Sequence, residues 1–293
     1  MKTALDCYGC FMRQGLQTAR LAGATEAQQG EVLRELMRHL LSVEGLDSPV
    51  FVVREMQRIV SRITGVDDPY AEIKSRNNQL AREWIGTVSK RFTDPSGDSL
   101  DHALRLSIAG NIIDYGPSDR FDLEGTLERC LAQPMAIDHG KRLEQRLSEA
   151  TSLAFLADNA GEIVFDFRLL SLLKRRFALD RILVVVREEA FLNDALERDA
   201  LEAGFGALAG VEIVRMGPGK PPPGSRGWEV WQRITASDMR LAKGQANAEA
   251  YNEEADFFLL FMVKCDLVAR VISAGGPNPV RTGDMVLVHT AAP

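Results

Sequence analysis

Six short runs rich in Leu, Ile, Val and Phe recur through the second half of the chain, and they constrain its fold more than any other feature. They cover residues 153–157, 181–186, 211–215, 239–242, 257–263 and 285–289. Stretches with helical periodicity lie between several of them, for example 195–203 and 228–236. Continuous apolar strands that alternate with helices are typical of a mainly parallel sheet covered on both faces. We therefore predict an α/β fold, with an α/β/α sandwich over residues 151–293.

The first half of the chain has a different pattern. Apolar residues recur every three or four positions in residues 32–41, 52–63, 70–86 and 100–113, which is the spacing of amphipathic helices. Residues 93–99 are rich in Pro, Gly, Ser and Asp and predict a loop. No segment before residue 150 alternates with the period of two that a strand requires. We predict an N-terminal all-helical domain over residues 1–150, which contributes to a cleft.

Composition excludes several classes of function. The formal net charge of -6 and the lack of a basic run argue against nucleic acid as a partner. No apolar stretch reaches the length of a membrane span, and the first ten residues do not have the pattern of a secretory signal. Four cysteines in 293 residues do not make a disulfide scaffold. We expect a cytoplasmic protein with no membrane partner, and the oligomeric state stays open.

Polar residues follow four of the predicted strands directly. They are Asp158-Asn159 after the first, Arg187 and then Asp194 after the second, the segment 243–247 after the fourth, and Lys264 after the fifth. The carboxyl ends of parallel strands meet at one edge of a sheet, where ligands bind in open α/β folds. We therefore expect these side chains to converge.

The types of residue at these ends indicate a chemistry. Asp158, Asn159 and Asp194 offer oxygen ligands, which hard divalent ions such as Mg²⁺ and Mn²⁺ prefer. Lys243 and Lys264 could bind an anion, and a divalent metal facing cations describes a phosphoryl site. Taken alone, the Asp158-Asn159 pair can also be interpreted as a helix cap, in which one of the two residues caps the following helix.

Two polar pairs in the first half leave alternatives open. Cys7 and Cys10 lie one helical turn apart, but no second pair of Cys or His at ligand spacing accompanies them. We expect buried helix cysteines, with a redox or metal role as the alternative. Asn111 and Asp114 interrupt an apolar helix on one face, either as its own cap or as a polar pair that faces the cleft.

Several familiar motifs are missing. The segment 217–220 lacks the full phosphate-loop pattern, and no Gly-x-Gly-x-x-Gly follows the first strand. Asp158 has Ala160 two positions on, not the second Asp of haloacid dehalogenase-like phosphatases. We expect His289 to be structural.

Together these segments resemble the metal-dependent damage-control phosphatase family, also called domain of unknown function 89, over nearly the whole chain. The resemblance is closest to its short prokaryotic branch with an N-terminal Cys-x-x-Cys. The matching segments are Cys7–Cys10, 68–70 with 73–74, 110–114, 158–162, Asn193-Asp194, 243–247 and Lys264. A departure follows Arg187, where Glu188-Glu189 replaces the small, Gly- or Pro-containing stretch that the family pattern leads us to expect.

The resemblance implies a phosphatase that hydrolyses small phosphoesters, such as sugar phosphates or damaged phosphorylated metabolites. It implies one divalent metal ion (Mn, Mg, Ni or Co) held by Asp158, Asn159 and Asp194, the residues assigned to catalysis. Substrate contacts are expected from Asn111, Asp114, Arg187, Lys243, Asn247 and Lys264. Whether Asp158 attacks phosphorus or only positions a metal and its water stays open, and we favour the water. The alternative function is a non-catalytic binding protein for a phosphorylated metabolite or a metal.

Overall fold

A single mixed sheet forms the centre of the computed structural model, which describes residues 1–42, 48–91, 99–110, 131–273 and 279–290. The order of its seven strands is β1-β7-β6-β5-β2-β3-β4. Only β6 and β7 pair antiparallel; the other neighbouring strands of this sheet pair parallel. The strands are β1 (Ile137–Asp138), β2 (Ser152–Leu156), β3 (Arg181–Arg187), β4 (Val211–Met216), β5 (Met239–Lys243), β6 (Phe258–Met262) and β7 (Met285–His289).

The six predicted strands are all present, within one or two residues of their expected bounds. The sequence prediction missed β1, which has two residues and pairs with Val286 and Leu287 at the edge of the sheet. A two-residue strand is too short to show any periodicity. It also corrects the expectation that no strand precedes residue 150.

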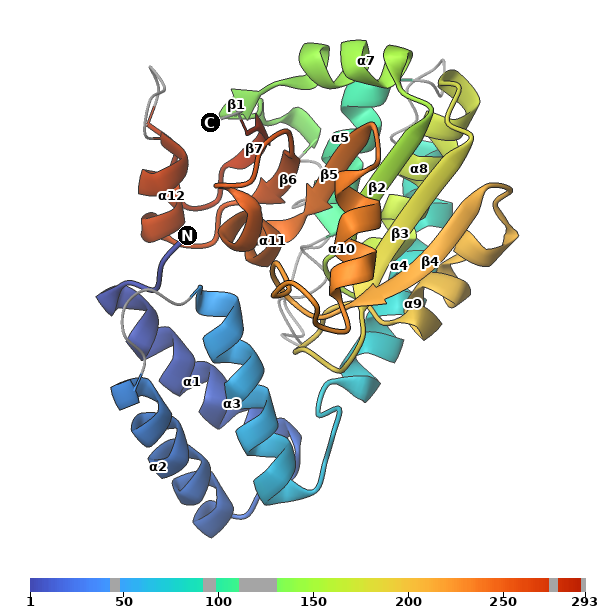
Figure 1. Cartoon of the computed structure of the whole chain (residues 1–293). Coiled ribbons are helices and arrows are strands. Elements are labelled where there is room, and N and C mark those ends of the chain that lie inside the picture. The colour runs from blue at the N-terminus through green and yellow to red at the C-terminus, as the bar shows by residue number, and fades with distance from the viewer. Residues whose placement is uncertain (43–47, 92–98, 111–130, 274–278, 291–293) are drawn as a thin grey trace.

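Helices cover both faces of the sheet, which confirms the predicted α/β/α sandwich (Figure 1). The side chains of β2 alternate between two cores: Leu153 and Phe155 pack on one face, and Ala154 and Leu156 on the other. The first face is covered mainly by α5 (Leu100–Ala109), α7 (Gly140–Glu149), α8 (Glu162–Arg176) and α9 (Glu197–Ala203). The second is covered by α10 (Trp228–Thr235), α11 (Gly244–Tyr251) and α12 (Asp266–Ser273). Both faces of β2 are buried, which explains its continuous apolar sequence.

The first three helices form a unit with a core of its own. α1 (Leu5–Leu21), α2 (Glu26–Ser42) and α3 (Pro49–Thr64) pack around Phe11, Leu36 and Met56. Figure 1 shows this helical unit beside the end of the sandwich that carries α11 and α12. The next helices, α4 (Ala71–Arg91) and α5, pack against α8 instead. The division between cores therefore follows α3 and does not coincide with the boundary expected at residue 150.

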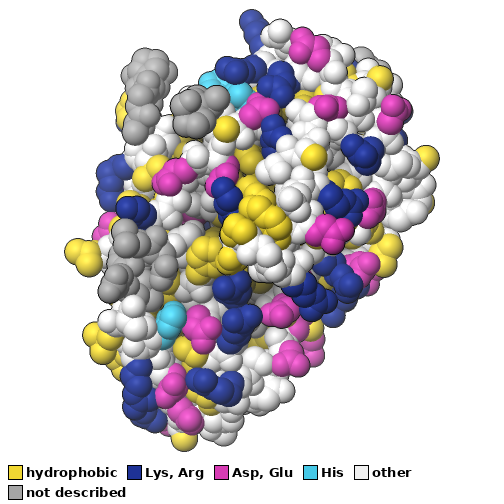
Figure 2. Space-filling model, in the orientation of Figure 1, with side chains coloured by type: hydrophobic (Ala, Val, Ile, Leu, Met, Phe, Trp, Pro, Cys, Tyr) yellow, Lys and Arg dark blue, Asp and Glu magenta, His cyan; other side chains and the backbone are white. Residues whose placement is uncertain are grey.

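The surface carries charges of both signs. On the face shown in Figure 2, acidic and basic side chains are interspersed. In the described ranges, no helix combines the length and the apolar character that a membrane span requires.

Candidate active site

Asp158 and Asn159 lie two and three residues after the end of β2, in the short connection to α8. The chain turns at Gly161, whose φ of 80° lies in the region that favours glycine. The N–H of Gly161 donates to Oδ1 of Asn78 on α4 at 2.7 Å, so α4 holds this turn in place. Helix α8 begins at Glu162 with Gly161 as its N-cap. The N-cap position considered for Asp158 or Asn159 therefore belongs to Gly161.

The side-chain amide of Asn159 has a defined orientation. Its Nδ2 donates to Oδ2 of Asp158 at 2.8 Å and to Oε2 of Glu162 at 3.3 Å. All three side chains are buried. Because the carboxylates of Asp158 and Glu162 hold the amide nitrogen, the side-chain oxygen of Asn159 is the atom that can bind a cation.

Asp194 reaches the same place from the loop after β3. The N–H of Ala195 donates to the carbonyl oxygen of Asp158 at 2.8 Å, and Asn159 and Asp194 form an isolated β-bridge. Leu192, two residues earlier, has a φ of 48° and packs against the core of the helical unit. The backbone therefore brings the predicted ligands together, from two loops 36 positions apart in sequence.

Arg187, the last residue of β3, is buried behind Asp194. Its Nε donates to Oδ2 of Asp194 at 2.6 Å, and its Nη2 donates to Oδ1 of Asn247 at 3.1 Å. Burial raises the pKa of Asp194, and the charge of the Arg187 guanidinium opposes that rise. Asn247 in turn donates to the carbonyl oxygens of Ala157 and Lys243, at 3.0 and 2.8 Å. Arg187 and Asn247 thus fix the position of Asp194 from inside the protein.

Lys243, the last residue of β5, is also fully buried. Its Nζ donates to Glu162, to Oδ1 of Asp166 at 2.9 Å and to the carbonyl oxygen of Ser107 at 3.2 Å. Burial raises the pKa of Asp166 to about 6, because the one ammonium cannot fully compensate two carboxylates. Burial disfavours the charged form of Lys243, but the two carboxylates outweigh it and raise its pKa. Lys243 therefore supports Glu162, and through it Asn159.

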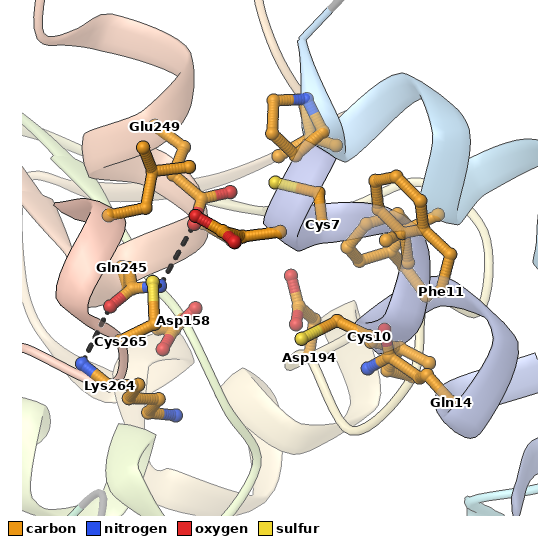
Figure 3. Close-up of a pocket in the computed structure, with 18 of the residues that line it drawn as sticks. Cys7, Cys10, Phe11, Gln14, Asp158, Asp194, Gln245, Glu249, Lys264 and Cys265 are labelled. Atoms are coloured by element: carbon orange, nitrogen blue, oxygen red, sulfur yellow. Dashed lines mark hydrogen bonds between the residues drawn. The ribbon is translucent and has the colours of Figure 1, made fainter. Parts of the chain in front are cut away.

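A cavity of about 550 Å³ lies between this edge of the sheet and the helical unit. Asp158, Asn159 and Asp194 line it, and Lys264 lines it from the segment after β6. The helical unit contributes Cys7, Cys10, Phe11 and Gln14 from α1 and Pro49, Val50 and Val53 from α3. Figure 3 shows the α1 side chains across the cavity from Asp158, Gln245 and Lys264. The cavity combines an acidic end with a largely apolar wall.

The family model of the damage-control phosphatase ARMT1-like domain matches residues 3–277. The chain belongs to this family. A damage-control phosphatase of Archaeoglobus fulgidus is 29% identical, over 98% of each chain. One of Pyrococcus horikoshii is 26% identical, over 92% of this chain and 94% of the relative. An uncharacterised protein of Methanocaldococcus jannaschii is 28% identical, over 98% of this chain and 95% of the relative.

A solved structure supports the same membership in the damage-control phosphatase family. The crystal structure of a domain of unknown function 89 protein from Pyrococcus horikoshii superimposes with a TM-score of 0.85. The match covers 99% of each chain at 25% sequence identity. The resemblance inferred from the sequence is therefore confirmed, both for the family and for the fold.

The predicted site residues of this family member divide into three groups. Asp158, Asn159, Asp194 and Lys264 line the cavity. Arg187, Lys243 and Asn247 were expected to contact substrate, but all are buried behind the cavity and bonded to protein groups. The described arrangement does not support direct contact of these three with substrate. Asn111 and Asp114 lie outside the described residues.

The Cys-x-x-Cys pair departs from expectation. Cys10 is exposed and Cys7 only partly buried, and both line the cavity. The expectation of two buried helix cysteines is therefore wrong. The reason is that this turn of α1 lies at the cavity: Cys7 and Phe11 line it and also pack in the core of the helical unit, whereas Cys10 lines it without joining that core.

The two glutamates that depart from the family pattern lie away from the cavity. Glu188 is 2.9 Å from Arg226, and Glu189 is 3.9 Å from Arg58. Neither is among the residues that line the cavity. Their negative charges are therefore balanced by arginines outside the site.

Sequence reasoning missed three acidic residues of the cavity wall: Asp6 and Asp266, which are exposed, and Glu249, which is partly buried. Glu249 lies four residues after Gln245 on α11, and Gln245 also lines the cavity. Positions i and i+4 share a helix face, so this spacing was the available signal.

Proposed function

We propose that the chain is a divalent-metal-dependent phosphatase that hydrolyses small phosphoesters, such as sugar phosphates or damaged phosphorylated metabolites. The observation that carries the proposal is the meeting of Asp158, Asn159 and Asp194 at one end of a cavity that also holds Lys264. Membership in the damage-control phosphatase family and the names of two relatives support the same activity.

The donor set fits one hard divalent cation. Two carboxylates and one amide oxygen are the ligand types that Mg²⁺ and Mn²⁺ prefer, and Ni²⁺ and Co²⁺ also accept them. In the part of the chain that the structure describes, no group of three or more His, Cys, Asp or Glu side chains is arranged for a metal. The third ligand of the proposed site is accordingly Asn159, whose amide nitrogen is already bonded to Asp158 and Glu162.

When bound, the cation would polarise the phosphoryl group and increase the acidity of an attacking water. The protein groups have separate tasks. Asp158 and Asp194 supply the negative charge that holds the cation, and Arg187 fixes Asp194 through the 2.6 Å hydrogen bond. Lys264, exposed at the cavity, would bind the phosphoryl oxygens and stabilise the charge that develops on them. The apolar wall from α1 and α3 would exclude water and contact the leaving group.

A phosphate-release assay tests the proposal. The protein is stripped with a chelator and incubated with a panel of pentose and hexose phosphates, with and without Mn²⁺, Mg²⁺, Ni²⁺ or Co²⁺. We expect release that depends on the added metal. The lack of release from every ester with every metal would contradict the proposal and favour a binding protein.

The variant Asp194→Asn adds a test of the site. It keeps an oxygen that can accept the hydrogen bond from Arg187, but it removes the negative charge of the proposed metal ligand. Activity should therefore fall by on the order of 100-fold or more. This is a larger loss than is usual for a residue that only supports a metal ligand. The matched control is Asp266→Asn. Asp266 also lines the cavity, is exposed, and accepts a hydrogen bond from Thr282 at 2.6 Å. Full activity in Asp194→Asn would contradict the metal assignment.

A further inference from the structure

Glu249 lies in the cavity wall on α11, the helix that begins beside Asp158. Gly244, the first residue of α11, approaches Asp158 so closely that a Cβ there would lie 1.9 Å from a carboxylate oxygen. Glu249 is five residues further along this helix, which is roughly 7.5 Å along its axis. Glu249 and Asp158 line the same cavity, so a substrate whose phosphoryl group is bound at Asp158 can extend toward Glu249.

The side chain of Glu249 is held at a defined place. The N–H of Lys264 donates to Oε1 of Gln245 at 2.7 Å, so the amide nitrogen of Gln245 is directed toward Glu249. That nitrogen donates to Oε1 of Glu249 at 2.9 Å (Figure 3). The Gln245 side chain thereby connects Glu249 to the backbone of Lys264, the predicted phosphate contact.

The surroundings of Glu249 stabilise its neutral form relative to its charged form. Burial raises the pKa of Glu249 to about 7, against the opposing effects of the hydrogen bond from Gln245 and the charges of the Met1 amino group and Lys264. From α1, the Cys7 thiol faces it, and burial raises the pKa of that thiol as well. A proton donor with a pKa near the working pH is the most effective general acid.

The other carboxyl groups of the cavity differ. Asp158 and Asp194 are the proposed metal ligands, and Asp6 and Asp266 are exposed. Among the carboxyl groups that line the described cavity, Glu249 alone is both partly buried and outside the proposed ligand set.

We propose that Glu249 is the general acid that protonates the leaving oxygen of the phosphate ester; this inference rests on the proposed phosphatase function. Water forms the new bond to phosphorus, and the bond from phosphorus to the ester oxygen breaks. The proton on Oε2 of Glu249 moves to that oxygen, so that the product leaves as a neutral alcohol. Glu249 is then a carboxylate and recovers a proton from solvent, while the attacking water loses its own proton to solvent.

The assignment narrows the class of substrate. Alkoxide ions are poor leaving groups and need a proton, whereas an activated phenolate leaves without one. The site is therefore suited to alkyl phosphate monoesters, such as the phosphate of a primary or secondary alcohol on a polyol.

The test compares Glu249→Gln with the wild type on two esters in the presence of the activating metal. For a sugar phosphate, we expect kcat to fall by about 10²- to 10⁴-fold. For p-nitrophenyl phosphate, kcat should change less than about threefold, because its leaving group needs no proton. The fall of kcat/KM above about pH 7 on the sugar phosphate should also disappear in Glu249→Gln. Glu253→Gln is the matched control, because Glu253 is 74% exposed and lies just beyond α11.

Two results would overturn the assignment, and a third would overturn the proposed function. An equal loss of activity on both esters in Glu249→Gln would indicate a structural role, and no loss on either would indicate no role. If the wild type hydrolysed neither ester with any metal, the proposed function itself would fail. Activity of the wild type on p-nitrophenyl phosphate separates that failure from failure of the Glu249 assignment alone.

Discussion

Gly244 and Asp158 are in closer contact than any side chain at position 244 would allow. A Cβ built on Gly244 would lie 1.9 Å from Oδ2 and 2.5 Å from Oδ1 of Asp158. Gly244 also has a φ of 80°, a conformation that L side chains rarely adopt. The turn from β5 into α11 therefore fixes where the carboxylate of Asp158 can be.

Gly244→Ala should displace Asp158 and abolish metal-dependent phosphate release. The left-handed backbone of a non-glycine residue adds about 1–3 kcal/mol of strain, so stability should also fall. The control is Gly224→Ala, because Gly224 has a φ of 77° and no atom within 4 Å of a Cβ. It should lose stability through the same strain but keep its activity. Thermal unfolding and a phosphate-release assay on both variants measure the two effects, and wild-type activity in Gly244→Ala would refute the account.

Lys264→Ala should chiefly weaken the transition state. A charge-assisted hydrogen bond to phosphate contributes about 1.5–3 kcal/mol, which corresponds to roughly a ten- to 150-fold loss of kcat/KM. Lys264 is exposed, so the melting temperature should hardly change. The comparison is Lys141→Ala, an exposed lysine on α7 outside the cavity. Steady-state kinetics on the same ester measure kcat/KM of both variants. An equal loss in the two variants would show that Lys264 does not bind the phosphate.

Asp256→Asn should destabilise the fold at a distance from the cavity. Asp256 accepts hydrogen bonds from Arg146 at 2.7 and 3.0 Å, from Arg240, and lies 2.8 Å from Nε2 of His289. Burial disfavours its charge, but these partners outweigh burial and hold the pKa of Asp256 well below its ordinary range. Asn tolerates the φ of 62° at this position about as well as Asp, so the change isolates the charge. The free energy of unfolding should fall by about 1.5–3 kcal/mol at neutral pH.

The lowered pKa of Asp256 makes the difference in free energy of unfolding between the wild type and Asp256→Asn depend on pH. The unfolded chain protonates Asp256 near its ordinary pKa of about 4, whereas the folded protein keeps it ionised to lower pH. The stabilisation is therefore complete above about pH 5 and decreases as the pH falls below about 4. Urea unfolding of the wild type and Asp256→Asn between pH 3 and 7 measures it. A difference between the two proteins that grew toward low pH would contradict the assignment.

The sheet could be predicted from the sequence because strands buried on both faces have continuous apolar sequences, as β2 and β3 do. The convergence of Asp158 and Asp194 followed from the parallel arrangement alone. The roles of the cations could not be predicted in this way. A lysine after a strand can face the cavity, as Lys264 does, or the core, as Lys243 does, and the choice depends on carboxylates from another element.

For Lys243 those carboxylates are Glu162 and Asp166 on α8, more than 70 residues away in sequence. The exposed Cys10 and the position of Glu249 likewise depend on how the helical unit packs against α11. No local pattern contains that packing. The local sequence thus predicted the residues at the edge of the sheet, but not which of them reach the cavity.

The most direct test of the metal assignment is the anomalous scattering of Mn²⁺ in crystals grown or soaked with Mn²⁺ and inorganic phosphate. We predict one strong anomalous peak within about 2.5 Å of carboxylate oxygens of Asp158 and Asp194 and of the amide oxygen of Asn159. Phosphate should lie between that peak and Lys264. A peak at the thiols of Cys7 and Cys10 in its place, or none in the cavity at saturating Mn²⁺, would contradict the central claim.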